Sequence, residues 1–272
     1  MSMPRIVHFS VEKFRPDEGE RFQFAEYEVT VKTGMTVNDA LFAIKESLDG
    51  SVTWRVSCRM GICGSCGMRI NGRPMLACQT QLAELGTNEI VLQPLANYPT
   101  IKDLVTDFME LYTKHKQVKP FIIRSDHDEM EKPMREYVQT PEQMEEYLQF
   151  AYCIMCGLCN SGCPVIPTDT SYIGPQALAQ AFRYNADSRD EGTLQRVEVV
   201  DTPHGCWRCH FAGTCSAVCP RGVDPALGIQ LLRKQVLRFR IGVEKPRRGA
   251  PVAASGEFKR RGGIPEAPPR TV

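Results

Sequence analysis

The chain has 272 residues, of which 42% are hydrophobic and 24% are charged, and its formal net charge at pH 7 is +1. This composition is ordinary for a globular protein and excludes a wholly disordered chain. The balanced charge indicates no particular class of charged partner. By length alone, one or two domains are expected.

The chain contains twelve cysteines, and their chemical state depends on whether the protein occurs in an oxidising or a reducing compartment. They could form the disulfide framework of a secreted protein, but the chain is large and its N-terminus, MSMPRIVHFSVEKF, lacks the basic-then-apolar pattern of a signal peptide. We therefore expect a reducing cytosol. Apolar runs stay below the ~18 to 20 residues that cross a bilayer, so membrane association is expected only through partner subunits or surface contacts.

The first hundred residues predict strands and one helix. Apolar and polar side chains alternate over residues 7–12 (VHFSVE) and again over residues 26–31 (EYEVTV), which is typical of half-buried strands. Thr36 is a predicted helix cap, and Gly50 ends the helix. The apolar residues of this helix are Val37, Ala40, Leu41, Ile44 and Leu48. These patterns predict a small mixed α/β domain over residues 1–105.

Beyond about residue 101 the pattern becomes helical, and a second, α-helical domain is predicted over residues 106–240. The segment Thr140-Pro141-Glu142-Gln143 is a capping-box start whose helix leads into Cys153. Prolines open two further helices. Their predicted apolar residues are Leu178, Ala181 and Phe182 after Pro175, and Leu231, Leu232, Val236 and Leu237 after Asp224-Pro225.

Residues 241–272 are rich in Pro, Gly and Arg and are predicted to form a flexible basic tail. A tail that contacts anionic lipid headgroups is the less favoured alternative.

The first set of cysteines has the spacing C-x4-C-x2-C followed by a distant fourth, which is typical of plant-type 2Fe-2S ferredoxins. Glycines at positions 61, 64 and 67 allow the backbone to wrap closely around the sulfurs, so that amide N–H groups can point at them. Four thiolates also suit tetrahedral zinc, but the spacing and the glycines disfavour it. The predicted ligands are Cys58, Cys63, Cys66 and Cys78.

The second and third sets have to be interpreted together. Residues 153–164 follow the bacterial pattern C-x2-C-x2-C-x3-C-P, in which the fourth thiolate binds a different cluster. The segment ending in Cys219-Pro220 has the same register, except that Ala212 stands where a cysteine is expected. The crossover rule predicts one 4Fe-4S cluster held by Cys153, Cys156, Cys159 and Cys219.

The remaining ligands are Cys163, Cys209 and Cys215. Three thiolates favour a cubane that lacks one iron, so the third cluster is predicted to be 3Fe-4S. Cys206 has no ligand role in this register and is interpreted as a buried free thiol. The alternative is that Cys206 completes a second 4Fe-4S cluster.

Taken together, SCRMGICGSCGMRING, YPTIKDLVTD, CGLCNSGCP, YIGPQAL, RYNADSRDEG and CSAVCPRGVDP, in that order, resemble the iron-sulfur subunit of succinate:quinone oxidoreductases and quinol:fumarate reductases. The resemblance covers roughly residues 5–240. It implies an α+β chain with an N-terminal plant-type ferredoxin (β-grasp) domain and an α-helical bacterial-ferredoxin-like domain.

In that family the subunit carries single electrons between the FAD of a flavoprotein subunit and a quinone at integral membrane anchor subunits, some of which hold haem. The resemblance implies those partners here, and a peripheral place on the cytoplasmic side of the cell membrane. It also suggests a quinone vicinity at Pro164, Trp207, His210, Gln230 and Arg233. Packing for Trp207 and a surface position for His210 are the alternatives.

The sequence departs from the family pattern at several positions, which concern contact with quinone and the choice between succinate oxidation and fumarate reduction. Arg233 stands where the family commonly has lysine, which argues against direct contact with quinone. VIPTDTSY lacks the tryptophan pair often seen in succinate dehydrogenases, and SCRM replaces the commoner SCRE. Both features, together with GCWRCHFAGTC, favour the fumarate-reductase-like branch. The branch does not fix the physiological direction, which depends on the potential of the quinone and on the flavoprotein subunit.

Other classes are less well supported. A related carrier for another dehydrogenase often has further cysteine-rich modules, and residues 240–272 contain no cysteine. A free ferredoxin or a zinc-binding interaction module is the non-enzymatic alternative. Binding of nucleic acid is not expected, because the sequence has neither a concentrated basic face nor an aromatic RNA-stacking motif.

Overall fold

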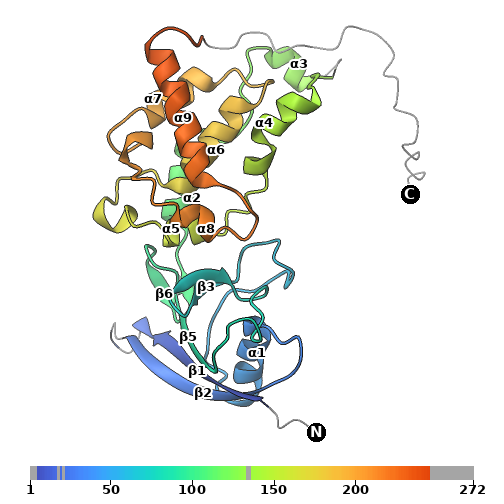
Figure 1. Cartoon of the computed structure of the whole chain (residues 1–272), viewed down its shortest axis with the longest axis vertical. Helices are drawn as coiled ribbons and strands as arrows, with labels where there is room; N and C mark the ends of the chain where they lie inside the picture. The colour runs from blue at the N-terminus through green and yellow to red at the C-terminus, as the bar shows by residue number, and fades with distance from the viewer. Residues whose placement is uncertain (1–4, 17–18, 20–21, 133–135, 246–272) are drawn as a thin grey trace, which may run out of the picture.

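The computed structural model describes residues 5–16, 19, 22–132 and 136–245 (Figure 1). Most of the predicted basic tail lies outside these residues. In the described part the chain forms two units, a mixed sheet with one helix at the N-terminal end and a group of helices after it.

The N-terminal unit is a five-stranded sheet with the order β2-β1-β5-β3-β4. Strand β1 pairs antiparallel with β2 and parallel with β5. The two predicted alternating segments lie within β1 and β2, and one face of β1 is fully buried through Val7, Phe9 and Val11. The strands are β1 (Arg5–Phe14), β2 (Phe22–Val31), β3 (Gly67–Ile70), β4 (Arg73–Leu76) and β5 (Glu89–Gln93).

The predicted helix is α1 (Val37–Ser47), and Thr36 caps it in a capping box with Asp39. The prediction that Leu48 belongs to its apolar face is wrong: Leu48 follows the last helical residue and is exposed. A second, two-stranded sheet of β6 (Thr100–Lys102) and β7 (Val105–Thr106) was not predicted, because strands this short have too few residues to show an alternating pattern.

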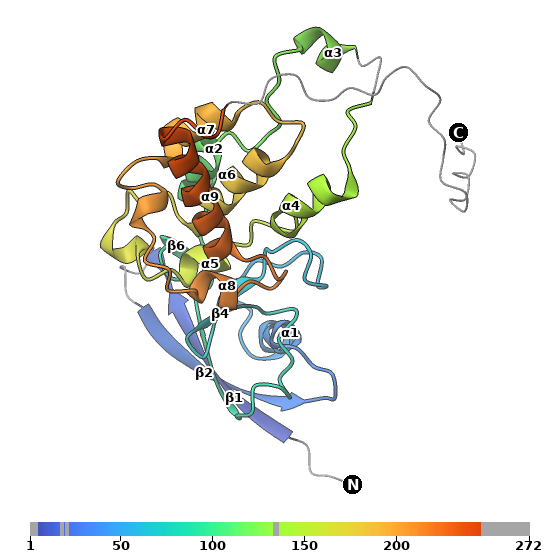
Figure 2. The ribbon, with the colours of Figure 1, turned by 45° about the horizontal axis from the view of Figure 1, so that its top comes forward.

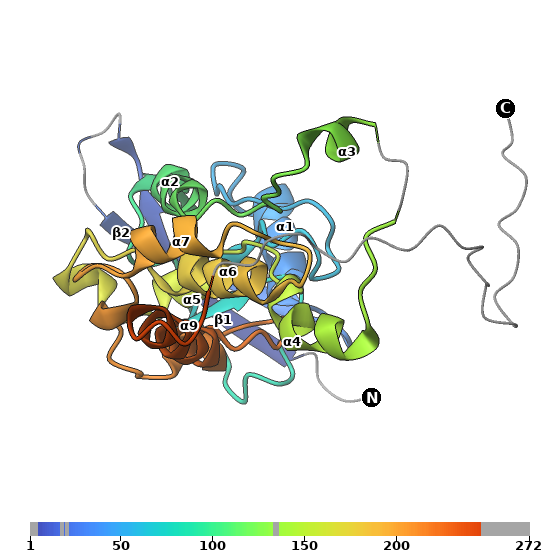
Figure 3. The same cartoon turned by 90° about the horizontal axis from the view of Figure 1, so that it is seen from above.

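The second unit is helical, as expected, and α6 lies at its centre, packed against α4, α7 and α9 (Figure 3). Thr140 forms the predicted capping box with Gln143, and Pro175 and Pro225 each open a helix. The helices are α2 (Met109–Gln117), α3 (His127–Glu131), α4 (Pro141–Ala151), α5 (Leu158–Ser161), α6 (Pro175–Ala186), α7 (Thr193–Val200), α8 (Thr214–Ala217) and α9 (Pro225–Arg240), with 3-10 turns η2 (Ile166–Thr168) and η3 (Cys206–Arg208).

Most predicted apolar positions of α6 and α9 are buried. Leu178, Leu232 and Val236 have no exposed surface, whereas Leu237 is exposed. The prediction for Leu237 is therefore wrong. One residue turns a helix by about 100°, which points Leu237 away from the face that Val236 buries.

The two units share a core where they meet. Figure 2 shows α5 and α8 at the end of the helical unit that faces β4. Cys156 and Leu158, from the helical unit, are buried within the core cluster of the N-terminal unit, and Val218 packs against it. Among the residues described, no helix has the length and apolar character that spanning a bilayer requires.

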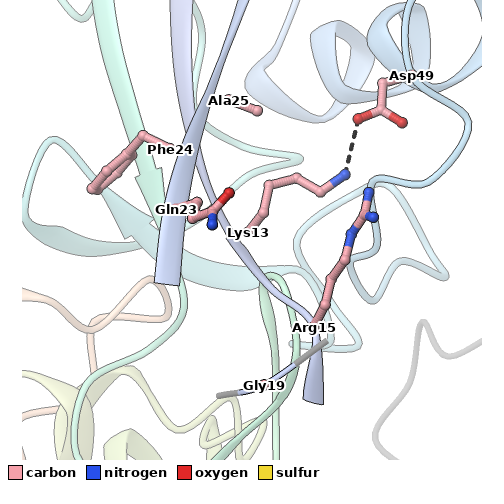
Figure 4. A pocket seen from close by; sticks show the side chains of 7 residues that line it. All are labelled: Lys13, Arg15, Gly19, Gln23, Phe24, Ala25 and Asp49. Carbon is pink, nitrogen blue, oxygen red and sulfur yellow. Dashed lines mark hydrogen bonds and ion pairs between the residues drawn. The ribbon is translucent and has the colours of Figure 1, made fainter. Parts of the chain in front are cut away.

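A buried charge stabilises the N-terminal unit. Lys13, on β1, donates from Nζ to Asp49 Oδ2 at 2.9 Å (Figure 4). The same Nζ donates to the Ser51 hydroxyl at 2.6 Å. Tyr27 donates its hydroxyl to the same carboxylate at 2.6 Å. Three hydrogen bonds to its carboxylate hold the pKa of Asp49 well below its usual range. The bond from Ser51 has the largest effect, followed by those from Tyr27 and Lys13.

This arrangement predicts an acid-dependent stability. Because the pKa of Asp49 is lower in the folded than in the unfolded chain, its contribution is fully present above pH about 4 and is lost as the pH falls below that value. Asp49→Asn is therefore expected to be less stable than the parent at pH 7, with a difference that narrows in acid. Urea unfolding of both proteins at pH 7 and pH 3.5 (about half a unit below the free carboxyl pKa) checks this, and a constant difference would contradict it.

Candidate metal centres

The first set of cysteines lies in the loop between α1 and β3 and directly after β4. Cys63 is exposed, Cys58 is partly exposed, and Cys66 and Cys78 are buried. Backbone amides point at these sulfurs. The amides of Met60, Ile62 and Cys63 donate to Cys58 Sγ at 3.4, 3.3 and 3.2 Å.

Backbone amides also donate to the sulfurs of the two buried cysteines of this set. The amide of Gly61 donates to Cys78 Sγ at 3.3 Å, and the amide of Cys78 donates to Cys66 Sγ at 3.5 Å. Gly61 has φ +71°, and a Cβ there would lie 2.1 Å from the Gln79 side chain. Donors aimed at sulfur stabilise thiolates, as a 2Fe-2S cluster requires.

The pKa values of this loop differ between its two sides. A hydrogen bond with Ser65 lowers the pKa of Cys63 to about 6, whereas burial raises the pKa of Cys66 to about 12. A buried thiol gives up its proton only if a cation compensates the thiolate charge, and bound iron supplies that charge.

A second cysteine-lined cavity lies between α5, α6 and α9. Its wall includes apolar side chains such as Val223 and Ala179, and Gln176 Nε2 donates to Cys153 Sγ at 3.8 Å. Burial raises the pKa of Cys153, Cys156 and Cys159, to about 12 for Cys156. The thiols that line this cavity are those of Cys153, Cys156, Cys159 and Cys219.

A third cavity has a different set of thiols. Pro164, Tyr172 and Ala212 contribute to its wall, and burial raises the pKa of Cys215 to about 11. The cysteines that line it are Cys163, Cys209 and Cys215. Helix α5 separates the two cavities: Cys159 lies within it and lines the second, whereas Cys163 follows its end and lines the third.

Cys206 lines neither of these cavities. It is fully buried in the core cluster of the helical unit, and burial raises the pKa of its thiol to about 11. Within the described residues, no three His, Cys, Asp or Glu side chains converge as a site for a single metal ion. In both cavities, several cysteine thiols line the wall, and this donor set fits the soft iron of an iron-sulfur cluster.

Of the five residues suggested for the quinone vicinity, two line the third cavity and three do not. Pro164 and His210 line the third cavity, and His210 is exposed. Trp207 Nε1 donates to Asp201 Oδ1 at 2.6 Å. Arg233 donates to three backbone carbonyl oxygens in the segment of residues 206–209, and to Gln230 Oε1. These carbonyls belong to Cys206 at 2.8 Å, Trp207 at 3.1 Å and Cys209 at 2.5 Å.

Sequence reasoning missed three residues around these centres. Gln176 and Tyr172 line the second and third cavities, and burial raises the pKa of the Tyr172 hydroxyl. Asn97 donates to three backbone carbonyls at the end of α5. The motif YIGPQAL contains the first two, but its pattern carries no information about which cavity they face.

Comparison with known proteins agrees with this arrangement. Residues 8–113 match the model of a 2Fe-2S iron-sulfur cluster binding domain, and residues 149–223 match that of a 4Fe-4S dicluster domain. The chain is 45% identical over 228 residues to a fumarate reductase iron-sulfur subunit of Mycobacterium tuberculosis, covering 84% of this chain and 91% of the relative.

Two further proteins extend the comparison. A fumarate reductase iron-sulfur subunit of Escherichia coli O6:H1 is 39% identical over 248 residues, which is 91% of this chain and 100% of the relative. A chain in the structure titled Mycobacterium smegmatis Sdh1 complex in the apo form superposes with a TM-score of 0.77 at 25% identity, covering 88% of this chain and 98% of that chain.

The resemblance inferred from the motifs is therefore confirmed, and so is the predicted order of a 2Fe-2S domain before a 4Fe-4S domain. With this identity and coverage, the chain belongs to the family of fumarate reductase and succinate dehydrogenase iron-sulfur subunits.

Proposed function

We propose that this chain transfers single electrons between a flavoprotein subunit and membrane quinone. The observation that carries the proposal is the grouping of eleven cysteines around one loop and two cavities, each with a donor set that fits an iron-sulfur cluster. When bound, such clusters supply one-electron transfer. The chain itself binds no succinate in this proposal.

The proposed ligand sets follow these groups. Cys58, Cys63, Cys66 and Cys78 hold the 2Fe-2S cluster; Cys153, Cys156, Cys159 and Cys219 hold the 4Fe-4S cluster; Cys163, Cys209 and Cys215 hold the 3Fe-4S cluster. The third assignment is supported by Ala212, which lines the third cavity where a fourth thiolate would stand, and by the position of Cys206 outside that cavity.

The proposed architecture is a β-grasp domain over residues 1–105, a bacterial-ferredoxin-like helical domain over 106–240 and a basic tail over 241–272. The mixed sheet with α1 beside it supports the first assignment. The proposed partners are an FAD-containing flavoprotein subunit and integral membrane anchor subunits, which would hold the chain on the cytoplasmic side of the membrane. The two relatives named fumarate reductase subunits support this assembly.

The quinone vicinity is proposed at the third cavity. Pro164 and the exposed His210 supply its wall and a titratable group. Trp207 and Arg233 support the loop behind it, since Trp207 donates to Asp201 and Arg233 donates to the backbone carbonyls of Cys206 and Cys209. Gln230 accepts from Arg233 through Oε1, whereas its buried Nε2 has no hydrogen-bond partner among the described residues. The hydrogen bonds from the guanidinium of Arg233 to backbone carbonyls support a role for this residue in positioning the loop.

Low-temperature EPR of the detergent-solubilised assembly tests the proposal. A three-iron signal is expected in the air-oxidised sample, and anaerobic succinate should abolish it while a 2Fe-2S signal grows. An active sample without a three-iron signal would assign Cys206 to a second 4Fe-4S cluster. If all three cluster signals are present but do not change when succinate is added, the chain belongs to another dehydrogenase. If the protein contains zinc in place of iron and acid-labile sulfide, the proposal that it carries electrons is refuted.

Cys209→Ser is expected to interrupt the path at its quinone end. Removal of one of three thiolates should eliminate the three-iron signal and most succinate-driven quinone reduction, while reduction of an artificial dye at the flavoprotein persists. Both activities and the EPR spectrum measure this result. Normal quinone reduction in this variant would mean that the proposed order of carriers is wrong.

A further inference from the structure

The loop of the first cysteine set touches the loop of the second at a glycine. Gly64, between Cys63 and Cys66, has φ +74°. A Cβ built on it would lie 2.8 Å from Cys156 Cβ, 3.0 Å from Cys156 Cα and 3.2 Å from the Ile154 carbonyl oxygen. These atoms belong to the backbone and to the root of a cysteine side chain, so they have little freedom to move aside.

The contact continues at the next glycine along the chain, Gly67. A Cβ on Gly67 would lie 3.2 Å from Leu158 Cδ2 and 3.3 Å from the Cys156 carbonyl oxygen. Cys156 and Leu158 are themselves buried in the core cluster that contains Cys66. The two loops therefore meet through backbone and apolar contacts within a shared core.

Asn97 fixes the helical side of this contact. Its side-chain amide donates to the carbonyl oxygens of Asn160 at 2.9 Å, Ser161 at 3.3 Å and Cys163 at 3.2 Å. Asn97 has φ +65°, a left-handed conformation that asparagine tolerates better than most residues. Nearby, the Tyr98 hydroxyl donates to the Gly157 carbonyl oxygen at 3.0 Å.

We propose that Gly64 and Asn97 are positioning residues for electron transfer between the first two centres. Gly64 lets the 2Fe-2S loop and the 4Fe-4S loop approach to backbone contact, and Asn97 holds the segment that carries Cys159 and Cys163 against the N-terminal unit. The inference rests on the proposed function. In the step concerned, one electron leaves the reduced 2Fe-2S cluster and enters the oxidised 4Fe-4S cluster, and no bond or proton is transferred.

Gly64→Ala tests the contact directly. The added methyl group has to separate the two loops, whereas Gly72→Ala is a matched control: Gly72 has φ +79°, and no described atom lies within 4 Å of a Cβ there. Both variants introduce the same left-handed strain. Iron and sulfide content are measured first, and then the microwave power that half-saturates the 2Fe-2S EPR signal in the dithionite-reduced complex.

In the parent, the reduced 4Fe-4S cluster should speed the spin relaxation of its 2Fe-2S neighbour. Gly64→Ala is expected to lower the half-saturation power several-fold with both clusters present, while Gly72→Ala matches the parent. Equal values in Gly64→Ala and the parent, or an equal fall in Gly72→Ala, would overturn the inference. A parent without either signal would instead refute the proposed function.

Asn97→Gly supplies a second variant if Gly64→Ala does not assemble its clusters. Glycine keeps the left-handed backbone and removes the three side-chain hydrogen bonds. The half-saturation power should fall in the same direction as expected for Gly64→Ala, by a smaller factor. An unchanged value with full cluster content would refute the positioning role.

Discussion

Cys219→Ala is expected to eliminate the 4Fe-4S cluster, leaving at most a three-iron cluster on the three remaining thiolates, and to interrupt electron transfer from succinate to quinone. Cys219 lies sixty residues beyond Cys159 in the chain, yet its thiol lines the same cavity as Cys153, Cys156 and Cys159. The cavity wall is largely apolar, so after this change water has little room to replace the missing ligand. Loss of the 4Fe-4S EPR signal after dithionite reduction, together with lower iron content, measures the effect.

Cys206→Ala is the matched control for this experiment. It removes a thiol of the same helical unit that is more deeply buried than that of Cys219, but one that packs in the core and lines neither cysteine cavity. Its iron content and EPR spectrum should equal those of the parent, with at most a modest loss of stability. A variant Cys219→Ala that kept all three signals would refute the crossover of ligands between the two segments.

Arg196→Met is expected to cause the largest loss of stability, about 3–5 kcal/mol, because it leaves a buried carboxylate without its partner. Arg196 and Asp190 have no exposed side-chain surface and form two short contacts, 2.6 Å and 2.9 Å. The same guanidinium donates to the carbonyl oxygens of Lys119 at 3.0 Å and Phe121 at 2.6 Å. Removing it therefore loosens the connection between α2 and α7.

Urea unfolding under anaerobic conditions measures this loss. Arg238→Met is a suitable control, since Arg238 forms a half-exposed pair with Glu244 at 3.4 Å, and such pairs contribute about 0–1 kcal/mol. Arg196→Lys should recover only part of the stability, because an ammonium group lacks the planar fork of donors. Similar losses for Arg196→Met and Arg238→Met would mean that the buried pair has no special role.

Local patterns predicted much of the architecture because backbone geometry imposes them. Alternation marked β1 and β2, and the capping residues Thr36 and Thr140 marked the starts of α1 and α4. Leu48 was misplaced because periodicity contains no information about where a helix ends. Leu237 was misplaced because the face of α9 that packs against α6 includes Val236 and excludes the residue that lies about 100° around the helix from it.

The sequence by itself determined the chemistry of this protein: the spacing of its cysteines specifies iron-sulfur ligation, because a cluster restricts how a short segment can wrap around it. Tertiary structure decided which distant groups meet. Arg233 reaches the carbonyls of residues 206–209, Asn97 reaches the end of α5, and Gly64 touches Cys156. No local pattern encodes these contacts, because they arise only when tertiary packing brings segments that are distant in the sequence together.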